Sequence, residues 1–169
     1  GAKQTIKNLP GKKSRHLVLQ SDLKEVAAIK ELVYISEKQV GPISVLVNNA
    51  ADFFPTPLFS ATEEEWDHLF ELNLKAPFFL SQAVGKNMKS SGEGKIINMV
   101  DVSTERPWKS FLPYCASKAA LISLTKGLAR ALSPEVQVNG IAPGTILTPP
   151  DHIEMDLTAS VEKSLLKRI

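Results

Sequence analysis

Short apolar runs alternate with longer amphipathic segments along this chain. The short runs are rich in valine, isoleucine and leucine, which is typical of buried strands, and they lie at residues 16–20, 43–47, 95–100 and 136–141. The amphipathic segments predict helices at residues 21–39, 62–88 and 111–132. Strands that alternate with helices predict an α/β fold in which a parallel sheet carries helices on both faces.

Polar residues mark where the predicted helices begin. Thr62 followed by Glu65 has the spacing of a capping box, and Ser21 with Asp22 is expected to cap the helix before it. After Thr62, apolar residues recur at helical spacing, namely Trp66, Leu69, Phe70, Leu74 and Phe78. The stretch 90–95 is rich in serine and glycine but precedes a strand, so we interpret it as a turn and not as a phosphate loop.

Composition narrows the classes of function. With 169 residues, of which 43% are hydrophobic, the chain has the length of about one domain with a core. Its 20 basic and 18 acidic residues are interspersed, which argues against a nucleic-acid partner. The single cysteine, Cys115, allows no internal disulfide, no metal site is predicted, and no apolar run approaches the ~18 residues that span a bilayer. We therefore expect a soluble cytoplasmic protein without a membrane partner.

The candidate chemistry centres on Tyr114 and Lys118, which share one face of the helix predicted at 111–132. A nearby ammonium favours the phenolate, so we expect Lys118 to lower the pKa of Tyr114 toward working pH. Asp101 follows the strand predicted at 95–100 and would complete an acid–base centre for reduction by hydride transfer. The alternatives are an ordinary amphipathic helix pair, and a capping or turn role for Asp101.

Further motifs surround this centre in a fixed order. Residues 46–51 read Leu-Val-Asn-Asn-Ala-Ala, residues 71–75 read Glu-Leu-Asn-Leu-Lys, and residues 138–144 read Val-Asn-Gly-Ile-Ala-Pro-Gly. Together with Tyr114 and Lys118, these motifs resemble the short-chain dehydrogenase/reductase family over nearly the whole chain. The resemblance implies a Rossmann-like doubly wound parallel sheet and an NAD(P)-dependent oxidoreductase.

Asp101 departs from the family pattern, which usually has a serine at that position. An aspartate there, and residues 51–57 after the Asn-Asn-Ala turn, resemble the pteridine reductase branch. That branch implies an NADPH-dependent reductase that transfers hydride to a pterin-like C=N bond. Tyr114 would donate the proton, Asp101 would replenish it, and Phe53 would stack on the substrate.

Several alternatives stay open at this point. The protein could instead be a carbonyl reductase or alcohol dehydrogenase of the same family, in which Asp101 is incidental, or a non-catalytic cofactor-binding remnant. NADH is not excluded, since the strand that discriminates the two nicotinamides is not recognised in this sequence. Phe53 could be an ordinary core phenylalanine.

The resemblance also assigns cofactor contacts. Asn73 would join Lys118 in a water-mediated proton path. The residues expected to contact the cofactor are Asp22, Asn49, Ala50, Tyr114, Lys118, Pro143, Gly144, Ile146 and Thr148. Their ordinary alternatives are a helix cap for Asp22, a helix kink for Asn73 and a turn at 143–144.

Family members open with a strand, a glycine-rich turn, a helix and a second strand, and they close with another strand. We recognise none of these here and expect residues 1–169 to be a partial domain, a piece of a longer protein. In the strand order 3-2-1-4-5-6, the strand at 16–20 would then lack neighbours in the sheet. By resemblance, residues 150–169 would form a substrate lid, and helices 62–88 and 111–132 would mediate a homotetramer.

Overall fold

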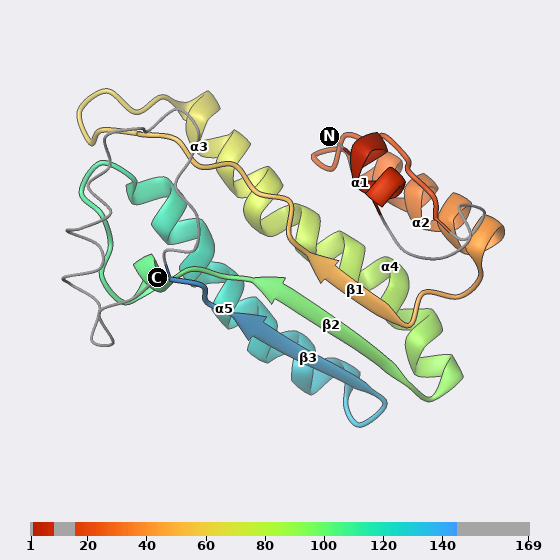
Figure 1. Cartoon of the computed structure of the whole chain (residues 1–169). Coiled ribbons are helices and arrows are strands. Elements are labelled where there is room, and N and C mark those ends of the chain that lie inside the picture. The colour runs from red at the N-terminus through yellow and green to blue at the C-terminus, as the bar shows by residue number, and fades with distance from the viewer. Residues whose placement is uncertain (1, 9–15, 145–169) are drawn as a thin grey trace.

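The computed structural model describes residues 2–8 and 16–144, which form a Rossmann-like α/β fold and confirm the predicted class (Figure 1). Three parallel strands lie in the order β1-β2-β3, at Val45–Asn48, Gly94–Met99 and Val136–Ile141. Leu46 pairs with Ile96, and Ile96 with Val138. The carboxyl ends of the three strands therefore meet at one edge of the sheet.

Two long helices, α4 at Ala76–Ser91 and α5 at Leu112–Leu132, lie behind the strands in Figure 1 and cover one face of the sheet. On that face Ile96 and Val138 are buried, whereas Val45 and Val47 on the other face are half exposed. Helix α2 then packs on α4. We expected helices on both faces of the sheet. Within the described residues, helices cover one face, and the other face is open.

The other elements are shorter. They are α1 at Ala2–Asn8, α3 at Glu63–Phe70, η2 at Glu71–Lys75 and η3 at Val102–Thr104, while α2 spans Val26–Val40. The capping box at the start of α3 is confirmed, because the Thr62 side chain accepts from the Glu65 amide and the Glu65 carboxylate accepts from the Thr62 amide. In the described part of the chain, no helix is long and apolar enough to cross a bilayer.

The helix predicted at 62–88 is interrupted by the π-helical turn η2. Pro77 lacks an N–H, so it cannot donate to the carbonyl of Asn73 four residues earlier as an α-helix requires. The ladder widens instead, and the Ala76 amide bonds to the carbonyl of Glu71. The extra residue in this turn carries the Asn73 side chain into the protein, where it is fully buried.

Residues 16–22 differ from the prediction. No strand forms at 16–20, because the segment lies across an apolar groove of about 380 Å³ from β1, lined by Leu17, Leu19 and Val47 among others, and has no strand to pair with. Ser21 and Asp22 do not cap α2, whose N-cap is Glu25. The Asp22 carboxylate instead accepts from the Lys24 amide, which closes a turn before the helix.

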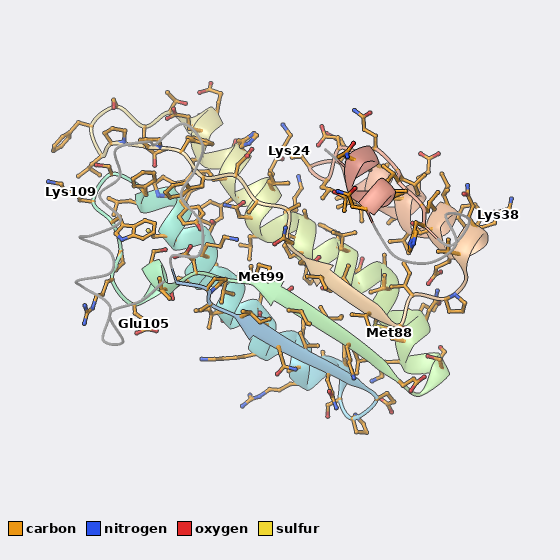
Figure 2. The ribbon with its side chains drawn as sticks, in the orientation of Figure 1. Lys24, Lys38, Met88, Met99, Glu105 and Lys109 are labelled. Atoms are coloured by element: carbon orange, nitrogen blue, oxygen red, sulfur yellow. The ribbon has the colours of Figure 1, made fainter. Side chains whose placement is uncertain are left out.

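Gly94 allows β2 to begin in close contact with α4. A Cβ atom at this position would lie 2.6 Å from Cβ of Met88, a fully buried residue that Figure 2 labels. We expect Gly94→Ala to lower the free energy of unfolding by about 1–3 kcal/mol through overpacking. Urea denaturation measures the effect, with Gly127→Ala in α5 as the control, since a Cβ there meets nothing within 4 Å. An unchanged midpoint for Gly94→Ala would contradict the close packing of β2 on α4.

Candidate active site

The predicted acid–base centre lies at the carboxyl edge of the sheet, where open α/β sheets bind ligands. Asp101 follows β2, and Tyr114 projects from the first turns of α5. The Tyr114 hydroxyl donates to Oδ2 of Asp101 at 2.8 Å, and Oδ1 of Asp101 accepts from the Ser103 amide at 2.7 Å. One oxygen of Asp101 therefore caps the short helix η3 while the other accepts from the phenol, and a role of Asp101 in proton transfer stays a prediction.

Lys118 is buried one helical turn below the tyrosine. Its Nζ donates to the carbonyl oxygen of Met99 at 2.9 Å and lies 5.8 Å from the centroid of the Tyr114 ring. Figure 2 labels Met99 at the end of β2, so the ammonium is anchored on the strand that delivers Asp101. An ammonium has three N–H donors, and the bond to Met99 uses one of them.

The pKa of Tyr114 is shifted upward, and not downward as the sequence predicted. Burial raises the pKa of Tyr114, and the hydrogen bond from its hydroxyl to the Asp101 carboxylate, with the negative charge of that carboxylate, raises it further. Burial also lowers the pKa of Lys118, and the Asp101 charge opposes that effect. The prediction that Lys118 makes Tyr114 acidic is therefore wrong for these residues. Tyr114 stays protonated near neutral pH, which is the state that can donate a proton.

Asn73 organises the loop after β1. Its Oδ1 accepts from the Asp52 amide at 3.0 Å, and its Nδ2 donates to the Asp52 carbonyl at 3.0 Å and to Oγ of Ser117 at 3.3 Å. These bonds join η2, the loop and α5. A path from Asn73 to Lys118 through water stays a prediction.

Phe53 packs against the Tyr114 ring and is 54% exposed, so the alternative of a core position is wrong. Its ring stacks on Phe111, with centroids 4.5 Å apart and planes 4° from parallel. It meets the rings of Tyr114 and Trp108 edge to face, at 4.8 and 5.8 Å. We call Phe53, Trp108 and Phe111 the aromatic wall. Sequence reasoning missed Trp108 and Phe111, although both precede Tyr114 closely in the chain.

The residues expected to contact the cofactor lie at the same edge where the structure describes them. Asn49 and Ala50 follow β1 with their side chains exposed, and Pro143 and Gly144 follow β3. Asp22 is exposed in the turn before α2. Ile146, Thr148 and the lid predicted at 150–169 lie outside the described residues. Among those that are described, no cluster of residues could hold a metal ion.

The donor set of this edge fits a nicotinamide nucleotide. Lys118 keeps N–H donors beyond its bond to Met99, and Asn49 and Ala50 present an open surface at the end of β1. A ribose offers hydroxyl groups that an ammonium can bind, and exposed backbone at strand ends suits a flat nucleotide. Lys118, Tyr114 and the 49–50 turn are therefore the residues that would hold it.

The chain has many relatives of known name. The family model described as short chain dehydrogenase matches residues 1–156. Gluconate 5-dehydrogenase of Gluconobacter oxydans is 38% identical over 128 residues, which are 75% of this chain and 50% of that protein. Galactitol 2-dehydrogenase of Agrobacterium fabrum is 41% identical over 127 residues, which are 74% of this chain and 50% of that protein.

A solved structure gives the same picture. The gluconate 5-dehydrogenase from Burkholderia cenocepacia, in complex with NADP and tartrate, is similar with a TM-score of 0.76 and 34% identity, over 83% of this chain and 56% of that one. The chain spans about half the length of the curated relatives it matches. These relatives are named for gluconate and galactitol and not for pteridines, so they do not support the pteridine reductase branch. The matched family model and the geometry of Asp101, Tyr114 and Lys118 agree, and the chain belongs to the short-chain dehydrogenase/reductase family.

Proposed function

We propose that the protein containing this chain is an NAD(P)-dependent oxidoreductase that interconverts an alcohol and a carbonyl group. The observation that carries the proposal is the Tyr114 hydroxyl, protonated and bound to Asp101 beside the buried Lys118 ammonium at the carboxyl edge of the sheet. A bound nicotinamide supplies or accepts the hydride. The family membership and the names of its relatives support this function.

The residues of this chain handle the proton. In the direction of reduction, Tyr114 passes its hydroxyl proton to the oxygen of the substrate, and the Lys118 ammonium stabilises the phenolate that remains. Oδ2 of Asp101 lies 2.8 Å from the phenol oxygen and orients the hydroxyl group. For a carbonyl substrate the phenolate regains its proton from water, and the carboxyl group is not required as a relay. In the direction of oxidation the same steps run in reverse.

The substrate that we propose is a polyhydroxylated carbonyl compound or its alcohol. The relatives named for gluconate and galactitol support this class. The aromatic wall supports this class as well, because an aromatic face can pack against the C–H groups of a sugar chain. The Tyr114 hydroxyl and the Asp101 carboxylate would then bind the hydroxyl and carbonyl groups of that chain. NADPH is the cofactor that we propose, since a solved relative holds NADP, and NADH remains the alternative.

A second candidate is reduction of a pterin-like C=N bond. It is favoured by Asp101, because a ring nitrogen needs a delivered proton and a carboxyl group bonded to the donor phenol can relay one. The exposed side of Phe53 also offers a flat surface on which a heterocycle could stack. Under this alternative the roles of Tyr114 and Lys118 are unchanged.

The test uses the full-length protein that contains residues 1–169. Oxidation of NADPH and NADH is followed with 5-keto-D-gluconate and with dihydrobiopterin, and reduction of NADP⁺ and NAD⁺ with galactitol. We expect turnover of a polyhydroxylated substrate with NADPH preferred. Turnover of dihydrobiopterin alone would favour the second candidate. No turnover, together with no change in NADPH fluorescence on binding, would favour a non-catalytic remnant and overturn the proposal.

We also propose that the protein is a homo-oligomer, with a homotetramer as the expected form, and that it works in the cytoplasm. Helices α3, α4 and α5 support the assembly, because a surface cavity of about 640 Å³ lies between them, lined by Phe70, Leu74, Phe78 and Leu124 with three charged residues. Trp66, which stacks on Phe70, leaves nearly half of its surface exposed there. Sedimentation of the full-length protein measures the number of subunits.

A further inference from the structure

Asp52 is held at three points by two different elements. Its amide and its carbonyl bond to the side chain of Asn73 in η2, both at 3.0 Å. Its carboxylate pairs with Nε2 of His68 in α3 at 2.5 Å. The backbone just before Phe53 is therefore fixed both through the main chain and through the side chain of Asp52.

The next residue along the chain forms part of the site. Phe53 stacks on Phe111 with one face and meets the Tyr114 ring with its edge, so a shift of its backbone would move the aromatic wall relative to the reacting hydroxyl. Phe54, on the other side of the chain, packs next to the His68 ring with centroids 5.9 Å apart. The position of the 52–54 segment is thus coupled to His68 by a polar contact and by a ring contact.

The pair of His68 and Asp52 lies at the surface and not in the core. About a third of the His68 side chain and half of the Asp52 side chain are exposed. Exposed pairs of this kind contribute little to global stability. We expect the effect of this pair to be local, because its contacts reach only the 52–54 segment and α3.

We propose that His68 and Asp52 form a positioning pair, which holds Phe53 as one wall of the substrate site and thereby sets affinity for the substrate without touching the reacting atoms. The inference rests on the proposed function, because it assumes that substrate binds between the aromatic wall and Tyr114. Neither residue has a role in the proton transfer derived above. His68 thus acts on substrate affinity from α3, a different helix from the one that carries Tyr114 and Lys118.

The experiment compares His68→Ala and His68→Gln in the full-length protein. The glutamine can still donate one hydrogen bond toward Asp52, whereas alanine cannot. Glu63→Ala is the matched control, because Glu63 is an exposed side chain in the first turn of the same helix. Two quantities are measured: hydrogen exchange of the backbone amides at 52–54, and the kinetics with NADPH and 5-keto-D-gluconate.

We expect the amides at 52–54 to exchange about tenfold faster in His68→Ala, with β2 amides unchanged, because only the local segment is released. We expect KM for the carbonyl substrate to rise about fivefold, with kcat and KM for NADPH changed less than about twofold, as suits part of one aromatic contact. In His68→Gln, the exchange rate and KM should lie close to the wild-type values. Glu63→Ala should match the wild type in both.

The two readouts separate this inference from the proposed function. Unchanged exchange in His68→Ala, or equal behaviour of the alanine and glutamine variants, would overturn the positioning pair. Faster exchange with an unchanged KM would overturn its role in substrate binding. Should the wild-type protein turn over no substrate, the proposed function fails, while the exchange result still decides whether the pair fixes the 52–54 segment.

Discussion

Tyr114→Phe should lower kcat of the full-length protein by about a hundredfold to ten-thousandfold, with KM for NADPH changed little. The variant removes the hydroxyl that we propose as the proton donor, and a positioned acid contributes about that factor to the rate. It also leaves Oδ2 of Asp101 without the hydrogen bond that it accepts at 2.8 Å. Initial rates with the substrate that the wild-type protein reduces measure the effect.

The chain supplies its own control for this substitution. Its other tyrosine, Tyr34, lies on α2 with 64% of its surface exposed, away from the carboxyl edge of the sheet. Tyr34→Phe should therefore leave kcat unchanged, and it removes the same atom from a different environment. A Tyr114→Phe variant as active as Tyr34→Phe would exclude Tyr114 as the proton donor.

The site could be predicted because its residues are tied to strand ends. A strand at 136–141 and strands near 43–47 and 95–100 follow from short apolar runs, and the structure places them within two residues of these bounds. In a parallel sheet the carboxyl ends lie together, so Asp101 had to lie near residues that follow β1. The i, i+4 spacing then placed Tyr114 and Lys118 on one side of α5.

The aromatic wall could not be predicted in the same way. Phe111 and Trp108 belong to the segment between β2 and α5, where Figure 2 shows Glu105 and Lys109, and no periodicity governs which of its side chains turn inward. Phe53 likewise follows a strand without regular structure of its own. Contacts between two such segments depend on tertiary packing, which the local pattern does not encode.

The π-helical turn and the segment at 16–20 show two other limits. A periodic pattern continues through η2, so the sequence predicted one helix, although Pro77 offered a signal of the break that buries Asn73. The run at 16–20 has the composition of a strand, but a strand is completed by hydrogen bonds to a neighbour. An apolar groove separates residues 16–20 from β1, and the two segments do not pair as strands.

The state of Tyr114 depends on distances that a sequence does not contain. The sequence predicted the wrong sign for the pKa shift of Tyr114, because burial and the hydrogen-bonded Asp101 carboxylate both raise this pKa. Because folding raises the pKa of Tyr114, the protonated phenol stabilises the folded state. This stabilisation is complete below the pKa of tyrosine in the unfolded chain, about 10, and is lost as pH rises through the pKa of Tyr114 in the folded protein. Alkaline pH above about 10 should therefore destabilise the fold in part through this phenol.

Asp101→Ser should make Tyr114 ionise at a lower pH. The substitution removes the carboxylate whose hydrogen bond and charge raise the pKa of the phenol, while the larger cause, burial, remains. An ultraviolet pH titration of phenolate measures the shift, with the signal of Tyr114 taken as the difference between the full-length protein and its Tyr114→Phe variant. Glu105→Gln is the control, since it removes an exposed carboxylate from the same loop.

The same variant decides between the two candidate reactions. A serine hydroxyl can polarise a carbonyl oxygen, so reduction of 5-keto-D-gluconate should be preserved or raised in Asp101→Ser if the substrate is a carbonyl compound. A C=N bond needs a relayed proton, so turnover of dihydrobiopterin should fall about a hundredfold or more if Asp101 is the relay. A phenol that titrates as in the wild type would show that Asp101 does not control Tyr114. If, in addition, Asp101→Ser turned over each substrate as fast as Glu105→Gln does, the Asp101 carboxylate would have the single role of capping η3 through the Ser103 amide.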